Sequence, residues 1–396
     1  MDNKQEHYDF LIIGSGLYGA FFNYLAKKCG KTCLILEKCP HIGGNLYTPI
    51  KDNIPIHAYG AHIFHTDDKL LWDFVSNMCG EMIPFINSPI ANYKGEIYNL
   101  PFNMNTFSKM FGESDPNKVK QIIQKEINKS GIIEPTNLEE QAKLLVGNTI
   151  YTKLIKDYTE KQWGRPCNQL DKDIIKRLPI RYTYDNNYFN DKYQGIPLDG
   201  YNKLIENLIC DTEVRLNVNY NNDDVVWEYE NKFDYLVYTG PIDEYFDYRY
   251  GALEWRSVKF DIEKLNTPNY QGNAVVNYTS HNEPYTRIIE HKFFNIHKKE
   301  TINSDITYIS KEYSIEWNGD CDPYYPINND KNNEILNKYL DDAKQYKSLL
   351  IAGRLGKYKY FDMDDTLIEC LKDFDNFCKL NNIDTGYHNV YNKLKY

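Results

Sequence analysis

The segment YDFLIIGSGLYGAFFNYLAKKCGKTCLILEKCPHIGGN, residues 8–45, decides the fold of this chain. Residues 10–13 form a short apolar run that is typical of a buried parallel strand. Residues 17–26 are apolar densely enough to predict a helix packed on a sheet. Between the two stand the glycines of a G-x-G-x-x-G pattern, Gly14, Gly16 and Gly19. Glycines at this spacing let the backbone approach a pyrophosphate at a helix N-terminus, so the segment predicts a dinucleotide site.

A second strand and an acidic residue complete the unit. Residues 33–36 are apolar and end at Glu37, which follows Gly16 by 21 positions, where a carboxylate can accept from a ribose hydroxyl. Gly43 and Gly44 follow in the pattern E-K-x-x-x-x-G-G, which is typical of FAD folds rather than of nicotinamide dehydrogenases. We therefore predict bound FAD. Three further residues of these turns are expected to join the cofactor site: Ser15, Lys38 and Asn45.

The composition excludes several classes of protein. At 396 residues, the chain is long enough for two or three domains with cores of their own. A net charge of −10 argues against nucleic acid as a partner. No apolar run approaches the length of a membrane span, and the polar N-terminus shows no signal peptide. The nine cysteines are odd in number and include no C-x-x-C pair, which favours a reducing cytoplasm.

Arginine is scarce in this chain, because only eight of the 46 cationic residues are Arg. Each arginine is therefore a candidate for a contact that needs its planar fork, with a carboxylate, a phosphate or a packing partner. They are Arg165, Arg177, Arg181, Arg215, Arg249, Arg256, Arg287 and Arg354. The 35 tyrosines are suited to lining polar sugar and nucleotide sites.

The segment IPIHAYGAHIFHT, residues 54–66, holds three histidines beside small residues. The H-x-x-H of His62 and His65 could indicate a metal, but no cluster of carboxylates or cysteines accompanies it. A backbone-rich loop lying against a flavin ring is the preferred interpretation, and we expect no metal.

Periodicity predicts a mostly helical middle region. A helix is expected over residues 69–78, a hairpin turning at Lys94-Gly95, and three helices between residues 115 and 163. Residues 158–166, YTEKQWGRP, interrupt these helices and present Trp163. This segment fits a mobile lid and fits equally a tryptophan that anchors a helix turn.

The second half of the chain returns to the first sheet. Residues 181–197 alternate as expected for a strand, and further strands are expected over 214–218, 233–238 and 349–352. Several β-like runs between residues 253 and 313 predict an antiparallel sheet, and helices are expected over 201–209, 334–346 and 364–378.

The predicted fold is α/β, with a FAD-binding Rossmann-like domain, an inserted helical domain and an antiparallel β-sheet domain. The FAD-binding domain is expected to comprise residues 1–78, 192–250 and 340–396. The helical substrate domain, with its lid, is expected over 104–180, and the sheet domain over 79–103, 181–191 and 251–339. No Ser-His-Asp spacing, zinc motif or P-loop is visible, so the flavin is expected to carry the chemistry. From the residues alone, the default function is an oxidase or dehydrogenase.

Segments spread over nearly the whole chain, and following one another in the same order, resemble those of the bacterial-type UDP-galactopyranose mutases. They include GAHIFHT (60–66), YTEKQWGR (158–165), IIKRLPIRYTYDNNYF (174–189), YQGIP (193–197), YTRIIEHK (285–292), PYYPINND (323–330) and YKYFDM (358–363). One departure is Phe361, where family members often have Tyr.

The resemblance implies an isomerase that interconverts UDP-galactopyranose and UDP-galactofuranose for glycan biosynthesis. In that family, N5 of reduced FAD attacks the anomeric carbon, UDP leaves, and a flavin–sugar iminium permits ring contraction. It also implies an external reductant such as NAD(P)H, and a homodimer.

The resemblance also assigns residues. Catalytic roles fall to Arg177, Arg287 and His62. Substrate-binding roles fall to Asn87, Tyr158, Trp163, Arg177, Tyr188, Asn277, Arg287, Tyr325 and Tyr360. Arg177 and Arg287 match two diphosphate-binding arginines, and Tyr158 matches a residue that stacks on uracil. Beside the glycine turns with Glu37 and Lys38, the cofactor residues are His62, Arg354, Asp362 and Met363.

Two other functions stay open. A flavin amine-oxidase-like oxidoreductase would share the cofactor pattern, and so would a non-catalytic flavoprotein that binds sugar nucleotides. Arg177 and Arg287 favour the mutase over the amine oxidase, because an amine oxidase has no use for two diphosphate clamps.

Overall fold

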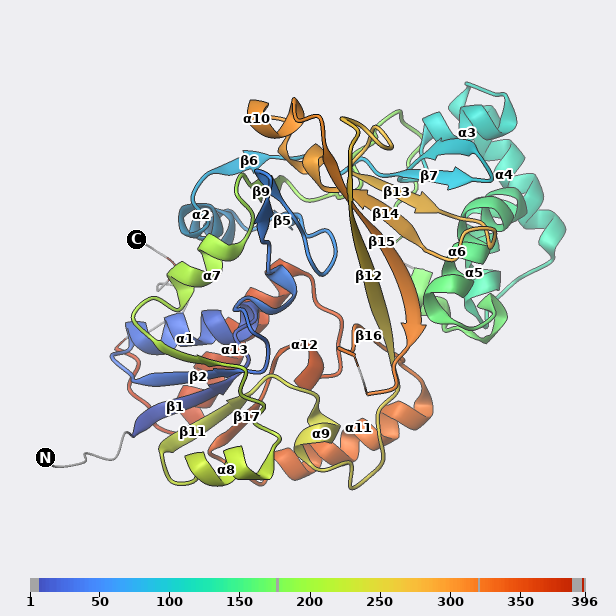
Figure 1. The fold of residues 1–396 in the computed structure, drawn as a ribbon. Coiled ribbons are helices and arrows are strands. Elements are labelled where there is room, and N and C mark those ends of the chain that lie inside the picture. Colours follow the sequence, from blue (N-terminus) through green and yellow to red (C-terminus); the bar gives the residue numbers. More distant parts are fainter. Residues whose placement is uncertain (1–6, 176–177, 320, 387–393, 395–396) are drawn as a thin grey trace, which may run out of the picture.

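A five-stranded parallel sheet forms the lower part of the molecule in Figure 1. The computed structural model describes residues 7–175, 178–319, 321–386 and 394. The strand order is β10-β2-β1-β11-β17. The strands are β1 (Tyr8–Ile13), β2 (Cys33–Glu37), β10 (Glu213–Leu216), β11 (Phe233–Tyr238) and β17 (Leu349–Ile351). The central strand β1 sets Ile12 between Ile35 and Val237, so the apolar runs predicted from the sequence form the middle of this sheet.

Helices cover both faces of this sheet, as its apolar strands require. Phe10 and Ile12 face a core shared with α1 (Leu17–Lys28), α7 (Asn202–Leu208) and α13 (Met363–Leu380). Leu11 and Leu236 face the opposite core, which includes residues of α9 (Ile242–Tyr245) and α11 (Asp330–Ala343). The short helix α8 (Asp223–Tyr229) lies on that same side in Figure 1. The glycine-rich turn between β1 and α1 therefore opens at the carboxyl ends of the strands.

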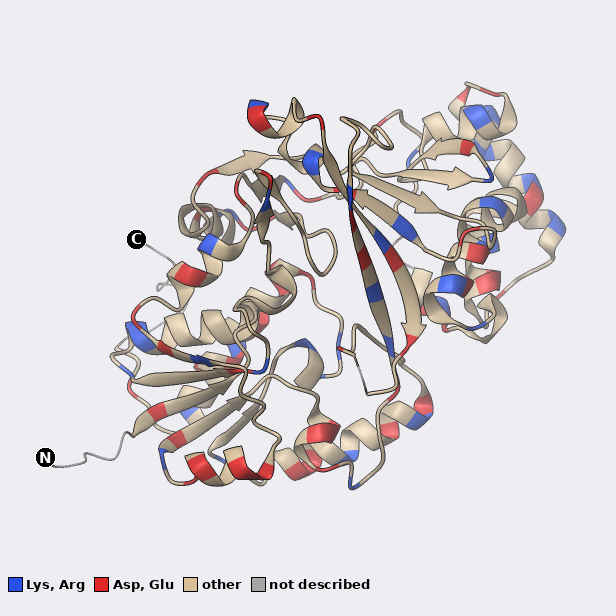
Figure 2. Cartoon of the chain, viewed as in Figure 1, with Lys and Arg blue, Asp and Glu red and all other residues tan. Residues whose placement is uncertain are grey.

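A seven-stranded sheet forms the upper right of the molecule in Figure 1, in the order β16-β12-β15-β14-β13-β7-β8. Its strands are β7 (Ile90–Tyr93), β8 (Glu96–Asn99), β12 (Trp255–Leu265), β13 (Val275–Tyr278), β14 (Arg287–Glu290), β15 (Thr307–Glu316) and β16 (Tyr325–Pro326). The expected antiparallel pairing holds except between β13 and β7, which are parallel. These two strands come from distant segments, so no hairpin turn fixes their relative direction. Charged positions recur along β12 and β15 in Figure 2.

Four helices pack beyond the end of this sheet: α3 (Met104–Phe111), α4 (Pro116–Ser130), α5 (Leu138–Ile150) and α6 (Asp157–Trp163). Asp115 accepts a hydrogen bond at the start of α4, and Asn137 does so at the start of α5. Gly147 interrupts α5 with a φ of 78°. A π-helical segment, Tyr151–Lys156, then leads into α6.

Shorter elements connect these layers. A three-stranded sheet has the order β5-β9-β6, formed by β5 (Phe64–Thr66), β6 (Met82–Pro84) and β9 (Tyr193–Pro197), and β3 (Ile50–Lys51) pairs with β4 (Ile54–Pro55). The remaining helices are α2 (Lys69–Met78), as predicted, α10 (Lys299–Ile302) and α12 (Gly353–Gly356). The 3-10 segments are Gly44–Leu46, Cys167–Gln169, Lys172–Ile175 and His291–Asn295. Among the described residues, no helix combines the length and apolarity needed to cross a bilayer.

The strand expected over residues 181–197 is limited to Tyr193–Pro197. In the preceding stretch, side chains bind backbone carbonyls that a strand would pair with a neighbour. Arg181 donates to the carbonyl of Phe189 at 3.2 Å, and Asn103 donates to that of Asp185 at 2.7 Å. Because these carbonyls are already satisfied, alternation alone does not make the stretch a strand. The division into three domains stays a prediction.

Candidate active site

One cavity of about 1650 Å³ extends from the glycine-rich turn of the parallel sheet to the seven-stranded sheet and α6. Its walls therefore come from segments that are far apart in the sequence. The β1–α1 turn contributes Gly14 and Gly16, the helical region contributes Tyr158, and the second sheet contributes Arg287.

The glycine turn is built for close backbone approach. Gly14 has a φ of +99°, a region that favours glycine. A Cβ at Gly19 would lie 2.1 Å from the carbonyl oxygen of Gly14, so the turn and α1 pack without side chains between them. A Cβ at Gly16 would meet no protein atom within 4 Å. Packing thus explains Gly19, whereas the open space at Gly16 leaves room for a ligand against the backbone.

The N-terminus of α1 is suited to an anion. No side chain caps this helix, and its first turn holds no acidic residue. Its first backbone N–H groups and the positive end of the helix dipole therefore face the cavity. Gly43, which has a φ of +98°, forms a bridge with Gly16 and closes the turn from the other side. The arrangement fits the pyrophosphate of a dinucleotide.

Glu37 lies at the end of β2 and is 5% exposed. Its carboxylate accepts from the backbone N–H and the hydroxyl of Ser15 at 2.8 and 2.7 Å, and from the N–H of Cys39 at 2.9 Å. A carboxylate offers about four acceptor positions. Glu37 is therefore held in place by the turn and can still accept from a ribose hydroxyl in the cavity.

The face of the seven-stranded sheet that lines the cavity carries a row of polar residues. Register places Asn277 on β13 and Glu312 on β15 opposite Arg287 on β14. The Arg287 Nε–H donates to the carboxylate of Glu312, which is 3% exposed. Burial alone would lower the pKa of Arg287, but Glu312 raises it overall, so the guanidinium stays charged. Its remaining N–H groups are donors suited to a phosphate.

Aromatic side chains line the cavity around Arg287. The ring centroid of Trp163 lies 6.2 Å from that of Tyr325, which stacks on Tyr360 at 5.9 Å. Burial raises the pKa of Tyr158, Tyr188, Tyr325 and Tyr360, so these phenols stay protonated at neutral pH. They can donate hydrogen bonds to anionic oxygens and also offer flat apolar faces.

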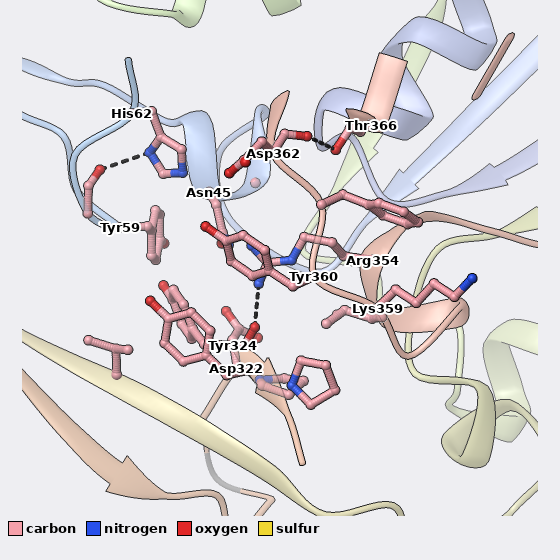
Figure 3. A pocket seen from close by; sticks show the side chains of 18 of the residues that line it. Asn45, Tyr59, His62, Asp322, Tyr324, Arg354, Lys359, Tyr360, Asp362 and Thr366 are labelled. Carbon is pink, nitrogen blue, oxygen red and sulfur yellow. Dashed lines mark hydrogen bonds between the residues drawn. The ribbon is translucent and has the colours of Figure 1, made fainter. Parts of the chain in front are cut away.

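Figure 3 shows the part of the cavity where His62, Asp362, Arg354 and Tyr360 converge. The His62 Nδ1 lies 2.8 Å from the carbonyl oxygen of Gly60. Burial lowers the pKa of His62 to about 4, so its imidazole is neutral at pH 7. Arg354 donates to the carbonyl of Tyr324 at 2.7 Å, with its guanidinium 5.6 Å from the ring centroid of Tyr360. Asp362 precedes α13, and its carbonyl accepts from the Thr366 hydroxyl.

The comparisons with known proteins agree with this site. A family model for UDP-galactopyranose mutase matches residues 153–360, and one for an NAD(P)-binding Rossmann-like domain matches residues 12–78. A Klebsiella pneumoniae protein described as a probable UDP-galactopyranose mutase is 38% identical over 95% of this chain and 95% of its own length.

The chain belongs to the UDP-galactopyranose mutase family.

Other relatives extend this result. A dTDP-fucopyranose mutase of Escherichia coli is 35% identical over 91% of this chain and 96% of its own length. A crystal structure of a reduced UDP-galactopyranose mutase shares the fold, with a TM-score of 0.70 and 13% identity. The match spans 98% of this chain and 97% of the chain in that crystal structure. The Rossmann-like dinucleotide-binding domain predicted from the glycine turn is thereby confirmed.

The residues expected to bind substrate in this family member gather on the same cavity. They are Asn87, Tyr158, Trp163, Tyr188, Asn277, Arg287, Tyr325 and Tyr360. Arg177 lies outside the described residues. The functional roles of these residues stay predictions, but their convergence from segments far apart in the sequence is the arrangement that a shared site needs.

The expected cofactor residues line the same cavity, with one exception. The cavity-lining members are Gly14, Gly16, Gly19, Glu37, Lys38, Gly43, Gly44, Asn45, His62, Arg354, Asp362 and Met363. Ser15 is fully buried and instead holds Glu37 from behind. The Lys38 ammonium pairs with Asp322 at 2.6 Å, so this lysine joins the turn to the loop before β16.

The H-x-x-H pair does not act as one unit. The His65 Nδ1 lies 2.8 Å from the carboxylate of Asp191, whereas the His62 Nδ1 faces the Gly60 carbonyl. Among the described residues, one group of side chains could converge on a metal, Asp157, Glu160 and His281, and it lies on α6 and the β13–β14 loop. The His281 Nε2 already lies 3.3 Å from the carboxylate of Glu160 and 3.7 Å from that of Asp157.

Sequence reasoning missed several residues of the cavity wall. Glu312, Tyr59 and Tyr324 all line the cavity. Glu312 sits in the β-like run ITYIS-KEYS, where alternation places it on the face of Arg287, but only the strand register shows that they pair. Tyr59 precedes GAHIFHT and Tyr324 lies within PYYPINND, two segments that carry the resemblance, but neither tyrosine has a signal of its own.

Proposed function

We propose that this protein is an isomerase that interconverts UDP-galactopyranose and UDP-galactofuranose, using reduced FAD. One observation carries the proposal: in a member of this family, a dinucleotide cradle and a cationic, tyrosine-rich wall line the same cavity. An oxidoreductase acting on amines would need the cradle but would have no use for Arg287 as a phosphate donor.

The residues present fit FAD. The uncapped N-terminus of α1 would bind its pyrophosphate, and the space over Gly16 would admit it without a clash. Glu37 would accept from the ribose hydroxyls. When bound and reduced, FAD supplies a nucleophile for the anomeric carbon of the sugar.

Arg287 is the group that this chain offers to the departing diphosphate. Its Nε–H is taken by Glu312, so the other edge of the guanidinium is free to donate two parallel bonds to phosphate oxygens. Neutralising the charge that develops on UDP as the anomeric bond breaks lowers the barrier to that step. Arg177 is proposed as a second clamp by resemblance.

The aromatic residues would orient the nucleotide and the sugar. Tyr158 offers a face for the uracil ring, and Tyr325 and Tyr360 offer hydroxyl donors for phosphate oxygens. Trp163, packed near Tyr325, would restrict water at the sugar. Because His62 is neutral, it places no positive charge beside the sugar carbon. Its Nδ1–H donates to the Gly60 carbonyl, so its Nε2 can accept one hydrogen bond.

The test is an isomerase assay with the holoprotein. Protein reduced with dithionite is mixed with UDP-galactofuranose, and UDP-galactopyranose is followed by anion-exchange chromatography. Interconversion with reduced protein, and little with oxidised protein, is the expected result. Failure to interconvert, together with oxygen consumption on an amine, would sink the proposal and support the oxidoreductase.

A second candidate substrate follows from the similarity to a dTDP-fucopyranose mutase, which is nearly as great as that to the Klebsiella protein. The same assay therefore includes a dTDP-fucofuranose arm. If the protein converts that sugar nucleotide in preference to UDP-galactofuranose, the substrate is a dTDP-sugar, and the proposed reaction type, isomerisation, is unchanged.

Two further features belong to the proposal. Reduced nicotinamide in solution would serve as the reductant, since the sequence shows one glycine fingerprint and no second dinucleotide domain. All nine cysteines are free thiols, which suits a reducing compartment such as the cytoplasm. The homodimer stays a prediction, for which sedimentation is the measurement.

A further inference from the structure

Helix α6 and the seven-stranded sheet form two walls of the cavity, and Lys161 joins them. The helix carries Tyr158 and Trp163 on the side that lines the cavity. The Lys161 ammonium instead reaches the loop between β13 and β14. It donates to the carbonyl of Tyr278, at the end of β13, at 2.7 Å, and to those of Glu283 and Tyr285 in the loop at 3.0 and 2.8 Å.

This contact uses the full donor capacity of an ammonium group, which has three N–H bonds. No carboxylate lies among the three partners, so hydrogen bonds to backbone carbonyls, rather than an ion pair, hold the ammonium in place. Burial lowers the pKa of Lys161 to about 8, although the charges of Glu283 and Asp157 oppose that shift. Burying the Lys161 ammonium costs desolvation free energy, and all three of its N–H groups are used in hydrogen bonds. This combination indicates a specific structural role.

The far end of α6 is fixed by a second cation. The Arg256 side chain is nearly fully buried, and its Nε–H donates to the carbonyl of Gln162 at 3.0 Å. The Ser314 hydroxyl on β15 donates to the same carbonyl. These donors cap carbonyls that the helix leaves unpaired at its C-terminus, where a cation is also favoured by the helix dipole. Gly164 packs against the guanidinium, because a Cβ there would lie 2.6 Å from the Arg256 Nη1.

The two clamps have different consequences for the cavity. Arg256 fixes where α6 ends, on β12 and β15. Lys161 fixes the distance from α6 to the β13–β14 hairpin, whose strands carry Asn277 and Arg287 in direct register. A nucleotide that stacks on Tyr158 while its phosphate binds Arg287 would span these two walls. The separation of the walls would then set how well both contacts form together.

We propose that Lys161 is a positioning residue for nucleotide binding, which holds the wall bearing Tyr158 and Trp163 at a fixed distance from the wall bearing Asn277 and Arg287. The inference rests on the proposed function, in that it takes the nucleotide of the substrate to lie between these walls. Lys161 itself does not line the cavity, so it would act through α6.

The experiment measures UDP binding and steady-state kinetics of FAD-loaded Lys161→Met protein. Methionine keeps the length and the apolar stem but removes all three donors, leaving three carbonyls unpaired. The variant weakens contacts with the nucleotide that are the same in the ground state and in the transition state. We therefore expect Kd for UDP and KM to rise roughly 10-fold, while kcat changes less than about 3-fold. The flavin absorbance spectrum and the FAD content are expected to match wild type.

Two further variants keep the inference testable. Lys156→Met, at the end of the π-helical segment before α6, is the matched control and should leave UDP affinity unchanged. Lys161→Arg keeps the charge, but a flat guanidinium cannot donate to three carbonyls grouped around one tetrahedral nitrogen, so a smaller rise in Kd is expected. If Lys161→Met gives no folded protein, the Lys161→Arg measurement decides.

The outcomes distinguish the positioning role of Lys161 from the proposed isomerase function. Wild-type UDP affinity in either folded Lys161 variant overturns the positioning role. A fall in kcat with UDP affinity unchanged also overturns it, because the residue would then act on the reaction and not on nucleotide binding. Wild-type protein that binds no UDP and interconverts no UDP-sugar contradicts the proposed function itself.

Discussion

The glycine turn and the β13–β15 face line one cavity, yet they are built by opposite means. The turn offers backbone groups, and its specificity comes from side chains that are missing, at Gly14, Gly16 and Gly19. The sheet face offers a charged side chain, Arg287, held by the buried carboxylate of Glu312. A backbone site of this kind is compact in sequence, whereas a side-chain site can be assembled from any strands that become neighbours.

This difference predicts how each region fails. A change in the turn removes the space on which both the fold and the cofactor depend. A change on the sheet face removes one interaction and leaves the rest of the cavity in place. Substitutions that separate these effects test the comparison directly.

The largest effect is expected for Gly19→Ala. The new Cβ would lie 2.1 Å from the Gly14 carbonyl oxygen, a contact with backbone that cannot be relieved unless β1 and α1 move apart. We expect a loss of about 3 kcal/mol or more in stability and no retained FAD, measured by urea unfolding and by flavin absorbance after gel filtration.

Gly16→Ala is the matched variant, because its Cβ would meet no protein atom within 4 Å. The unfolding free energy of the apoprotein should stay within about 1 kcal/mol of wild type, while FAD affinity falls. Equal FAD affinity in Gly16→Ala and wild type would show that the dinucleotide does not lie against this turn.

A smaller and more selective effect is expected for Arg287→Ala. The FAD content should be unchanged, whereas isomerase turnover should fall about 10²- to 10³-fold through loss of the diphosphate donor. Arg249→Ala, a surface arginine paired with Asp342, is the control for charge. Turnover within a few-fold of wild type would contradict the clamp.

Removal of Arg287 alone also leaves Glu312 as a buried carboxylate without its partner, which can destabilise the protein by about 3–5 kcal/mol. The double variant Arg287→Gln with Glu312→Gln replaces the ion pair by two neutral amides. It should recover stability relative to Arg287→Ala without recovering turnover. Recovery of both would mean that Arg287 is a structural residue.

The comparison also explains how far the sequence leads. The β1–α1–β2 unit was predictable, because strand, glycines and Glu37 lie within 30 residues and each follows a local rule. The partnership of Arg287 with Glu312 follows from the register of β14 and β15, which no local pattern specifies. The resemblance located Arg287 and Tyr158, but only the fold places Lys161 between their walls.

The incorrect strand over residues 181–192 follows the same logic. Its alternation of polar and aromatic residues satisfied a local rule, but Arg181 and Asn103 bind its carbonyls from the side. Side-chain contacts with the backbone, from within the stretch in the case of Arg181 and from a distant segment in the case of Asn103, override local periodicity. Local sequence patterns therefore predict sites built from backbone groups better than sites built from side chains.

The smallest effect concerns the loop that joins the two regions, residues 57–62, which rests on His291. This imidazole is fully buried, and its Nδ1 accepts from the backbone N–H of His57 at 3.2 Å. Burial lowers the pKa of His291 to about 3, so the folded state keeps it neutral. The unfolded chain takes up a proton near pH 6.5, so it binds more protons than the folded chain between pH 6.5 and 3.

Stability therefore rises with pH in that window and is lost as the pH falls through it. From pH 7 to pH 5, His291 accounts for a loss of roughly 2 kcal/mol. His291→Asn should remove that share of the pH dependence in urea unfolding, and His297→Asn, an exposed histidine, should leave it unchanged. The pKa values of buried His57 and half-buried His62 are lowered as well, which contributes with the same sign, so some pH dependence should persist in His291→Asn. An identical slope in His291→Asn and wild type would mean that this imidazole is already protonated in the fold, and the loop beside the cavity would then carry a charge.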